Sequence, residues 1–410
     1  MNLLPAPDLL PSYALALVQV LVPLRALVAV LLGALIYWLT PHPMRRWALL
    51  AVSVAVILLG YERPVLLAAA VVAVGGLVFW AVRRGVPRPY TVGGLTVLYA
   101  VLHGLFGLLM FTPWLSWTGL SPAFVLPTIG LTTAFTFLRL VHFAVDFTAS
   151  TQPAPRPLTF LAWCLFFPTF VHLPLIRYGA WADQFERLPC APSWAQMRHG
   201  ALRIGQALFK GALVGVVYVA LNPAGVLLNP VGANAGQLFA AAVVLAITYY
   251  VGFSGYVDLG IGAARLYGIV LPENFAPAMK MARVARMRDF WRNWNISVTQ
   301  WLRDYVFEPL GGHRRHPVRN VMLTMIACGL WHSVSLYGLL WGFGLGLLLV
   351  MEHFWNRLRL RRGLPELPAP ARTALLLCAL AGVNLALTPY GYDPQWGRYL
   401  YPLFWLGITV

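Results

Sequence analysis

The chain has 410 residues, of which 60% are hydrophobic and only 10% are charged. Soluble globular domains carry about 25% charged residues, so this composition excludes a soluble enzyme and predicts a polytopic membrane protein. The net charge of +17 comes from basic clusters between the apolar runs, where cytoplasmic loops and anionic lipid explain it without nucleic acid.

The apolar runs give the predicted order of membrane segments, since a helical span requires about 20 apolar residues. In chain order the runs are 14–39, 46–61, 64–82, 91–112, 121–147, 158–177, 203–222, 236–259, 319–336, 337–352, 373–389 and 397–410. Some are short or merge, so about ten to twelve segments are expected to cross or enter the membrane. The stretches 152–157 and 179–198 are predicted connectors.

The stretch 260–318 is too polar to span the membrane and yet is rich in aromatic residues. Its apolar side chains fall at helical spacing, and they are Phe290, Trp291, Trp294, Val298, Trp301, Leu302 and Tyr305. The pattern predicts an amphipathic helix at the membrane interface, or a re-entrant helix beside a water-filled cavity. Residues 271–274 and 311–312 are expected to stop the helical structure before and after it.

The apolar run GLWHSVSLYGLLWG (329–342) carries a single histidine, His332. An ionisable residue at membrane depth is costly and marks a functional site by default. Imidazole can take a proton from a hydroxyl and return one to a leaving group near neutral pH. The alternative, which the sequence leaves open, is a core histidine bonded to a backbone carbonyl.

Other polar residues near the apolar runs are further candidates. Asn295 could orient a substrate hydroxyl or donate to a developing oxyanion, or it could only cap or bond helix backbone. Asp258 could pair with an arginine of the central region. Arg303, Asp304 and Glu308 could form an ion-pair network that shapes a cavity, or could bind substrate.

Several enzyme and metal-site motifs are absent from the sequence. It has no HExxH, no Cys/His cluster, no Gly-rich phosphate or dinucleotide loop and no GxSxG elbow. Its four cysteines show no metal spacing and are expected to be small buried residues: Cys164, Cys190, Cys328 and Cys378. No metal site, nucleotide hydrolysis, dinucleotide redox chemistry or serine-hydrolase activity is therefore predicted.

Three segments resemble a known family, the membrane-bound O-acyltransferases (MBOAT). GYVDLGIGAARLYGIVLPENF (255–275) resembles the stretch that leads into the family's central motif. DFWRNWNISVTQWLRDYVFEPLGG (289–312) resembles that motif in the bacterial branch that modifies cell-envelope polymers. GLWHSVSLYGLLWG resembles the segment with the family's histidine, here His332, and a weaker match covers 127–146 and 166–178.

The resemblance implies an all-α bundle with re-entrant or interfacial helices around a central tunnel. The 1–410 chain would be one membrane domain, with N-terminal spans in 1–120 and C-terminal spans in 346–410. Between them a catalytic core in 121–345 would hold the central motif at 250–342. The expected location is the bacterial cytoplasmic (inner) membrane.

The same resemblance implies acyl transfer from a thioester to a hydroxyl. His332 would be the general base on the acceptor hydroxyl, and the tunnel would orient both substrates and exclude water. Bacterial envelope members usually carry a second histidine where this chain has Asn295, which is assigned a positioning role because an amide does not titrate near neutral pH. The residues expected to contact substrate are Trp291, Trp294, Ser297, Arg303, Asp304, Trp331 and Ser335.

The implied partners follow from this chemistry. No bound cofactor is expected, and the acyl donor would be a thioester on an acyl carrier protein or on coenzyme A. The acyl group would be D-alanyl or acetyl, and the acceptor an extracytoplasmic glycopolymer or a periplasmic acyltransferase. Basic cytoplasmic loops would suit an acidic carrier protein, and equally the membrane lipid. The alternatives are acylation of a lipid or protein hydroxyl, suggested by Asn295, and a non-enzymatic transporter or export scaffold.

Overall fold

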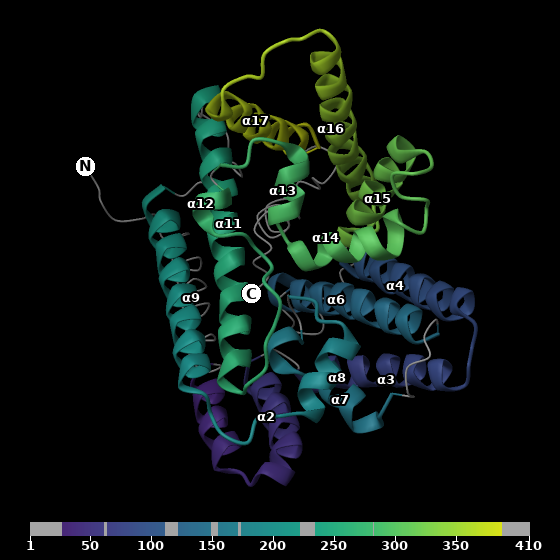
Figure 1. Ribbon diagram of the computed structural model, residues 1–410, viewed down its shortest axis with the longest axis vertical. Helices are drawn as coiled ribbons and strands as arrows, with labels where there is room; N and C mark the ends of the chain where they lie inside the picture. The colour runs from purple at the N-terminus through teal and green to yellow at the C-terminus, as the bar shows by residue number, and fades with distance from the viewer. Residues whose placement is uncertain are drawn as a thin grey trace.

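The computed structural model describes residues 27–60, 64–110, 122–148, 155–170, 174–221, 234–281 and 283–387. Every regular element in these ranges is a helix, and no strand occurs within them (Figure 1). This confirms the all-α prediction. The physical reason is that a backbone surrounded by lipid must satisfy its hydrogen bonds within the segment.

The helices of the first half surround the N-terminal part of the core. In chain order they are a helix at Leu27–Leu39, η2 (His42–Met44), α2 (Arg45–Gly60), α3 (Pro64–Arg83), α4 (Arg88–Met110), α6 (Pro122–Thr148), α7 (Pro157–Cys164), η3 (Phe167–Thr169) and α8 (Tyr178–Glu186). The second half holds α9 (Trp194–Leu221), α11 (Ala235–Leu266), α12 (Ala278–Met281), α13 (Met287–Asn293), α14 (Ile296–Leu302), the π-helical turn η4 (Arg303–Phe307), α15 (Pro317–His332), α16 (Leu336–Arg361) and α17 (Ala369–Leu387).

Four of the described helices are long and apolar enough to cross a membrane. They are His42–Gly60, Val65–Arg83, Trp194–Val217 and Leu336–Arg361. This confirms a polytopic membrane protein. The predicted spans 14–39 and 397–410, and the predicted connector 152–157, lie wholly or partly outside the described residues.

Two helix pairs frame the molecule. α9 and α11 pack along one flank, and α15 packs against α16 on the other (Figure 1). α3, α4 and α6 lie below α15 in this view, on the side away from α9, and α4 and α3 each pack on α6 (Figure 1). The short helices α13 and α14 lie between the two flanks, and the chain then reaches the α15–α16 pair through η4.

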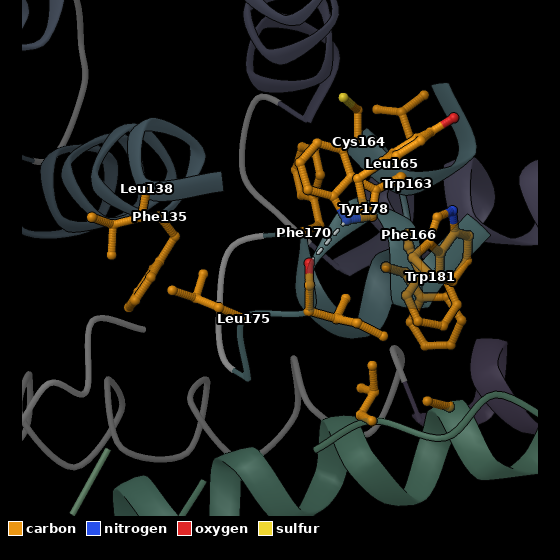
Figure 2. Close-up of a cluster of buried hydrophobic side chains, with 14 of the residues drawn as sticks. Phe135, Leu138, Trp163, Cys164, Leu165, Phe166, Phe170, Leu175, Tyr178 and Trp181 are labelled. Carbon is orange, nitrogen blue, oxygen red and sulfur yellow. Dashed lines mark hydrogen bonds between the residues drawn. The ribbon is translucent and has the colours of Figure 1, made fainter. Parts of the chain in front are cut away.

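An aromatic core joins α6 to the segment from α7 to α8 (Figure 2). The fully buried Trp163 donates through its indole N–H to the carbonyl oxygen of Ile176 at 3.2 Å. The guanidinium of Arg139, 3% exposed, lies 4.5 Å from the centroid of the Trp163 ring. It also donates to backbone carbonyls of Trp163, Cys164 and Thr169. A cation at the C-terminal end of α7 offsets the helix dipole there, which ties this end to α6.

The predicted amphipathic helix over 290–305 is corrected by the structure. α13 ends at Asn293 and α14 begins at Ile296, so the chain breaks at Trp294 and Asn295. Asn295 has φ +43° and ψ 54°, which is left-handed backbone that continues neither helix. The predicted stop at 311–312 is confirmed, since Gly311 and Gly312 both have positive φ.

The predicted pairing of Asp258 with the central region is also corrected. Asp258, 5% exposed on α11, is paired with Lys210 at 2.7 Å and Arg203 at 3.0 Å, and both cations come from α9. Arg203 also pairs with Glu273. Ion pairs therefore join α9 to α11, and Arg203 also holds the loop after α11 against these two helices.

Candidate functional site

His332 is the last residue of α15, and its side chain is exposed, whereas its neighbour Trp331 is 6% exposed. The imidazole centroid lies 4.4 Å from the Trp331 ring and 5.1 Å from the Trp341 ring. Neither ring nitrogen of His332 bonds to another described residue, so no backbone carbonyl within the described part of the chain holds this histidine. An accessible, unpaired ring nitrogen can accept or return a proton.

A glycine seam, defined as Gly329 on α15 with Gly338 and Gly342 on α16, holds the helix pair that carries His332. A Cβ atom on Gly329 would lie 2.0 Å from the carbonyl oxygen of Gly338, and one on Gly342 would lie 2.3 Å from that of Met325. These distances are far below van der Waals contact. The two backbones therefore touch, as in other membrane helix pairs with small residues at the interface.

The turn after His332 is closed by two serines. The hydroxyl oxygens of Ser333 and Ser335 lie 2.8 Å apart, and the Ser335 hydroxyl accepts from the backbone N–H of Gly338 at 3.2 Å. Ser335 is thus the N-cap of α16. The glycine seam and this cap make the position of His332 a rigid one.

The indoles of two tryptophans donate hydrogen bonds to backbone carbonyls on consecutive turns of α6. The indole N–H of Trp331 donates to the Ala134 carbonyl at 3.1 Å, and that of Trp301 donates to the Leu138 carbonyl at 2.9 Å. Carbonyls four residues apart are separated by about 6 Å along a helix. The end of α15, with His332, and the end of α14 are therefore fixed one turn apart on α6. The hydroxyl of Tyr99 on α4 adds a bond to the Trp331 carbonyl.

Asn295 is 7% exposed and lies at the break between α13 and α14. Its carbonyl accepts from the backbone N–H of Thr299, but its side chain does not cap α14. Instead its Oδ1 accepts from Nδ2 of Asn274 at 3.1 Å. The alternative in which this amide only bonds helix backbone is therefore not what the structure shows.

Asn274 caps α14 from outside the helix. Its backbone oxygen accepts from the N–H of Ile296 at 2.8 Å, and its side-chain Oδ1 accepts from the N–H of Ser297 at 2.8 Å. These are two of the N–H groups that the first turn of a helix leaves unpaired. The Ser297 hydroxyl in turn accepts from the Leu175 N–H at 3.0 Å, so the loop before α8 joins the same network.

Trp294 lies at the centre of an aromatic cluster. Ring centroids of five residues from α11, the following loop and α13 lie between 5.1 and 6.1 Å from it: Tyr249, Tyr250, Phe253, Phe275 and Phe290. Trp291 contacts Phe290 edge-on at 5.5 Å, and its buried indole N–H has no partner among the described residues. Trp294 thus supports Asn295 from the α13 side, and Trp291 keeps a free donor.

Arg303 and Asp304 pair with each other in the π-helical turn η4. The Arg303 Nε lies 2.7 Å from Asp304 Oδ1, and Arg177 pairs with the same carboxylate. Tyr305 donates its hydroxyl proton to Asp146 of α6 at 2.7 Å. This network joins η4, α6 and the loop at 174–177, and Glu308 forms no ion pair with the described residues. π-Helical turns occur frequently at functional sites.

The predicted site residues fall into two groups. Trp331, His332 and Ser335 belong to the α15–α16 turn, while Asn295, Ser297, Trp294 and Trp291 belong to the α13–α14 break. Within the described part of the chain no direct hydrogen bond or ring contact joins Asn295 to His332. The two groups are connected through α6, which receives both indole donors.

Sequence reasoning missed Asn274 and Glu352. The carboxylate of Glu352 on α16 accepts from the backbone N–H of Met287, the first residue of α13. Glu352 thus ties the helix that follows His332 to the helix that precedes Asn295. The only signal for Asn274 was its place in LPENF, and nothing in the sequence marked Glu352. Their partners are 21 and 65 residues away, which local patterns do not reveal.

Residues 134–387 match the model of the MBOAT, membrane-bound O-acyltransferase family. The chain is 31% identical to the probable alginate O-acetylase AlgI of Pseudomonas syringae pv. tomato, over 57% of this chain and 45% of that protein. It is 28% identical to the probable alginate O-acetylase AlgI of Pseudomonas putida, over 76% of this chain and 56% of that one. It is also 28% identical to the teichoic acid D-alanyltransferase of Streptococcus thermophilus, over 51% of this chain and 55% of that protein. The chain thus spans about half the length of these relatives.

Proposed function

We propose that this chain, which belongs to the membrane-bound O-acyltransferase family, transfers an activated acyl group from a thioester to a hydroxyl group of a cell-envelope glycopolymer. The observation that carries the proposal is the accessible imidazole of His332, free of hydrogen bonds to described residues on a rigid helix turn. A general base must reach the proton that it removes, and it needs an unpaired nitrogen to receive it.

The proposed step is a direct acyl transfer. A ring nitrogen of His332 takes the proton of the acceptor hydroxyl while the oxygen attacks the thioester carbonyl carbon. The C–S bond then breaks, and the thiolate leaves with the proton that the imidazolium returns, which gives an ester and a thiol. Asn295 would donate to the carbonyl oxygen on which negative charge develops.

The acyl group and the acceptor belong to the proposal. The relatives are named for alginate acetylation and for D-alanylation of teichoic acid, which supports acetyl or D-alanyl transfer to an extracytoplasmic glycopolymer. The donor thioester would sit on an acyl carrier protein or on coenzyme A at the cytoplasmic face of a bacterial inner membrane. The acceptor would be the polymer itself or a periplasmic acyltransferase.

A second candidate function is acylation of a lipid or protein hydroxyl by the same chemistry. Asn295 favours it, since asparagine at this position resembles the branches of the family that use such acceptors. The two candidates share His332 and differ in where the acylated product is recovered.

The test is mass spectrometry of envelope polymers from cells that lack the chain, complemented with the natural chain, with His332→Ala or with His353→Ala. His353 is another exposed histidine, on α16, and serves as the matched control. We expect an acetyl or alanyl mass on polymer hydroxyls with the natural chain and with His353→Ala. His332→Ala should lose at least about 10²-fold in acylation, because general-base catalysis contributes that much.

Retention of more than about a tenth of the acylation by His332→Ala would contradict the role of His332. Acyl groups in the lipid extract and not in the polymer fraction would select the second candidate. If neither fraction changes on deletion, transfer to a glycopolymer is wrong, and the result favours a transporter or an export scaffold.

A further inference from the structure

The hydrogen bonds around Asn274 determine which way its side-chain amide faces. The atom of this amide that meets the backbone N–H of Ser297 at 2.8 Å must be the oxygen, because a backbone N–H can only donate. The other atom, Nδ2, therefore meets the side chain of Asn295 at 3.1 Å. Unlike most asparagine amides, whose two ends are hard to tell apart, this one is assigned by its partners.

The same reasoning then assigns the amide of Asn295. Since Nδ2 of Asn274 donates, the atom that it meets on Asn295 is the oxygen Oδ1. The NH₂ group of Asn295 is left on the side away from Asn274, and the one side-chain hydrogen bond of Asn295 to a described residue is the one that its Oδ1 accepts from Asn274. Asn295 thus offers its surroundings a donor and no free acceptor on that side.

We propose that Asn274 is a positioning residue, which locks the Asn295 amide so that its NH₂ group donates to the acyl carbonyl oxygen during transfer. The inference rests on the proposed acyltransferase function and deepens it. A donor that is already oriented stabilises developing negative charge without reorganisation, whereas an amide free to rotate would also present its oxygen to that charge.

The side-chain amide of Asn274 is held in one orientation because the residue is buried and hydrogen-bonded. It is 0% exposed and its backbone oxygen is held by the Ile296 N–H at 2.8 Å. A rotation of its amide by 180° would set NH₂ against the Ser297 N–H and oxygen against oxygen at Asn295. A buried polar group that loses its hydrogen-bond partner is costly, so the flipped state is scarcely populated.

Asn274→Asp tests the lock with an isosteric change. An ionised Asp keeps the acceptor for Ser297 but has no proton for Asn295, whose amide then turns its NH₂ group inward and loses its donor role. A protonated Asp has a hydroxyl that can donate to Oδ1 of Asn295 as Asn274 does. We expect a loss of at least about tenfold in transfer rate at neutral pH, recovering relative to the natural chain as the pH falls.

The matched control is Asn293→Asp, two residues before Asn295. Asn293 is 8% exposed and donates through Nδ2 to the Asp289 carbonyl, so this change also removes one buried donor. Its amide does not contact Asn295, and its rate ratio to the natural chain should not depend on pH. Asn274→Ser, which has no group long enough to reach Asn295, should show the loss without the recovery at low pH.

The measurement is thiol release by membranes of cells that carry each variant, between about pH 5 and about pH 8, with acetyl-coenzyme A and a D-alanylated carrier protein as separate probes. The double variant Asn274→Asp/Asn295→Ala should be no slower than Asn295→Ala alone, because both changes remove the same donor. Detergent unfolding temperatures identify any variant that does not fold, and Asn274→Ser then carries the test in place of Asn274→Asp.

The outcomes separate this inference from the function beneath it. If the natural chain releases no thiol from either probe and modifies no polymer, the proposed function fails. If transfer depends on His332 but Asn274→Asp behaves like Asn293→Asp, or adds its full effect to Asn295→Ala, then Asn274 only supports the fold and the inference is overturned.

Discussion

Asn295 occupies a backbone conformation that few residue types accept. At φ +43° and ψ 54° the left-handed region admits Asn, Asp and His several-fold more often than other residues with a Cβ atom. The same position can therefore hold a histidine, as in the envelope branch that the chain resembles, or the asparagine found here, without change in the backbone. The choice between them changes the chemistry of the side chain and leaves its position unaltered.

We predict that Asn295→His folds and transfers acyl groups at a reduced rate, because imidazole can donate but does not match the amide geometry set by Asn274. Asn295→Ala should lose about 10²–10³-fold in kcat, the usual effect of removing one oxyanion donor. The measurement is the thiol-release rate as a function of pH. Full activity of Asn295→His with a new ionisation in its pH profile would instead show that the site runs a two-histidine relay.

For single residues, the sequence indicated which side chains could carry the chemistry but did not indicate which residues hold them in place. His332 and Asn295 stood out because polar groups in apolar runs are costly. Asn274, Glu352 and Arg139 did not, since their roles depend on partners that only the folded chain brings near. Asn274 in particular resembles an ordinary turn residue until its bonds to α14 are seen.

The break between α13 and α14 shows why helical spacing wrongly predicted one continuous helix over 290–305. Each helix has 7 residues, and the apolar side chains of the sequence keep helical spacing across the two-residue break between them. The interruption is imposed by Asn274, which pairs with the N–H groups of Ile296 and Ser297 that a continuous helix would have used internally. Periodicity measures which face is apolar and does not detect such a cap.

The glycine seam gives a prediction for the α15–α16 pair. A Cβ atom on Gly338 would lie 2.0 Å from the Ser333 carbonyl and 2.6 Å from that of Gly329, and these backbone atoms can yield only if the helices separate. We expect Gly338→Ala to destabilise the protein by about 3 kcal/mol, the upper end of the usual cost of overpacking, and to abolish acyl transfer. Gly205→Ala, on α9 where nothing lies within 4 Å of the added atom, is the control.

The unfolding transition of both glycine variants can be followed in detergent by circular dichroism. Gly205→Ala should be as stable as the natural chain or slightly more so, because alanine favours helix. An unchanged transition for Gly338→Ala would mean that the α15–α16 contact is looser than the structure indicates.

Across the whole molecule, α16, α17 and the turn between them hold the residues just before and at the start of α13. Glu366, in the turn before α17, pairs with both Arg286 and Arg372, and the Thr373 hydroxyl donates to the Val284 carbonyl at 3.0 Å. Glu352 binds the N–H of Met287 nearby. The membrane class followed from composition and the family from three motifs, but no feature of the sequence predicted that residues 352–373 anchor residues 284–287.

The Arg286–Glu366 pair in this anchor is expected to make the stability of the fold depend on pH. The hydrogen bond from Arg286 lowers the pKa of the Glu366 carboxyl below its ordinary value. A depressed folded-state pKa means that the pair stabilises the fold above the pKa of the unfolded chain and loses that contribution as the pH falls through the folded-state value. We expect the unfolding temperature to fall with acid, and to fall less steeply in Glu366→Gln.

Glu308→Gln is the matched control, since Glu308 is exposed and forms no ion pair with the described residues. Its acid dependence should follow that of the natural chain. Identical acid slopes for Glu366→Gln and the natural chain, by thermal unfolding in detergent at several pH values, would show that the Arg286–Glu366 pair contributes nothing to the fold.

The two indoles beside His332 have an energetic consequence for the transfer itself. Their centroids lie 4.4 and 5.1 Å from that of the imidazole, and their planes are inclined to it by 53° and 78°. These two ring contacts hold the imidazole in one orientation. In the proposed transfer the ring takes a proton and returns it without turning, so residues that never exchange a proton would lower the entropic cost of the step.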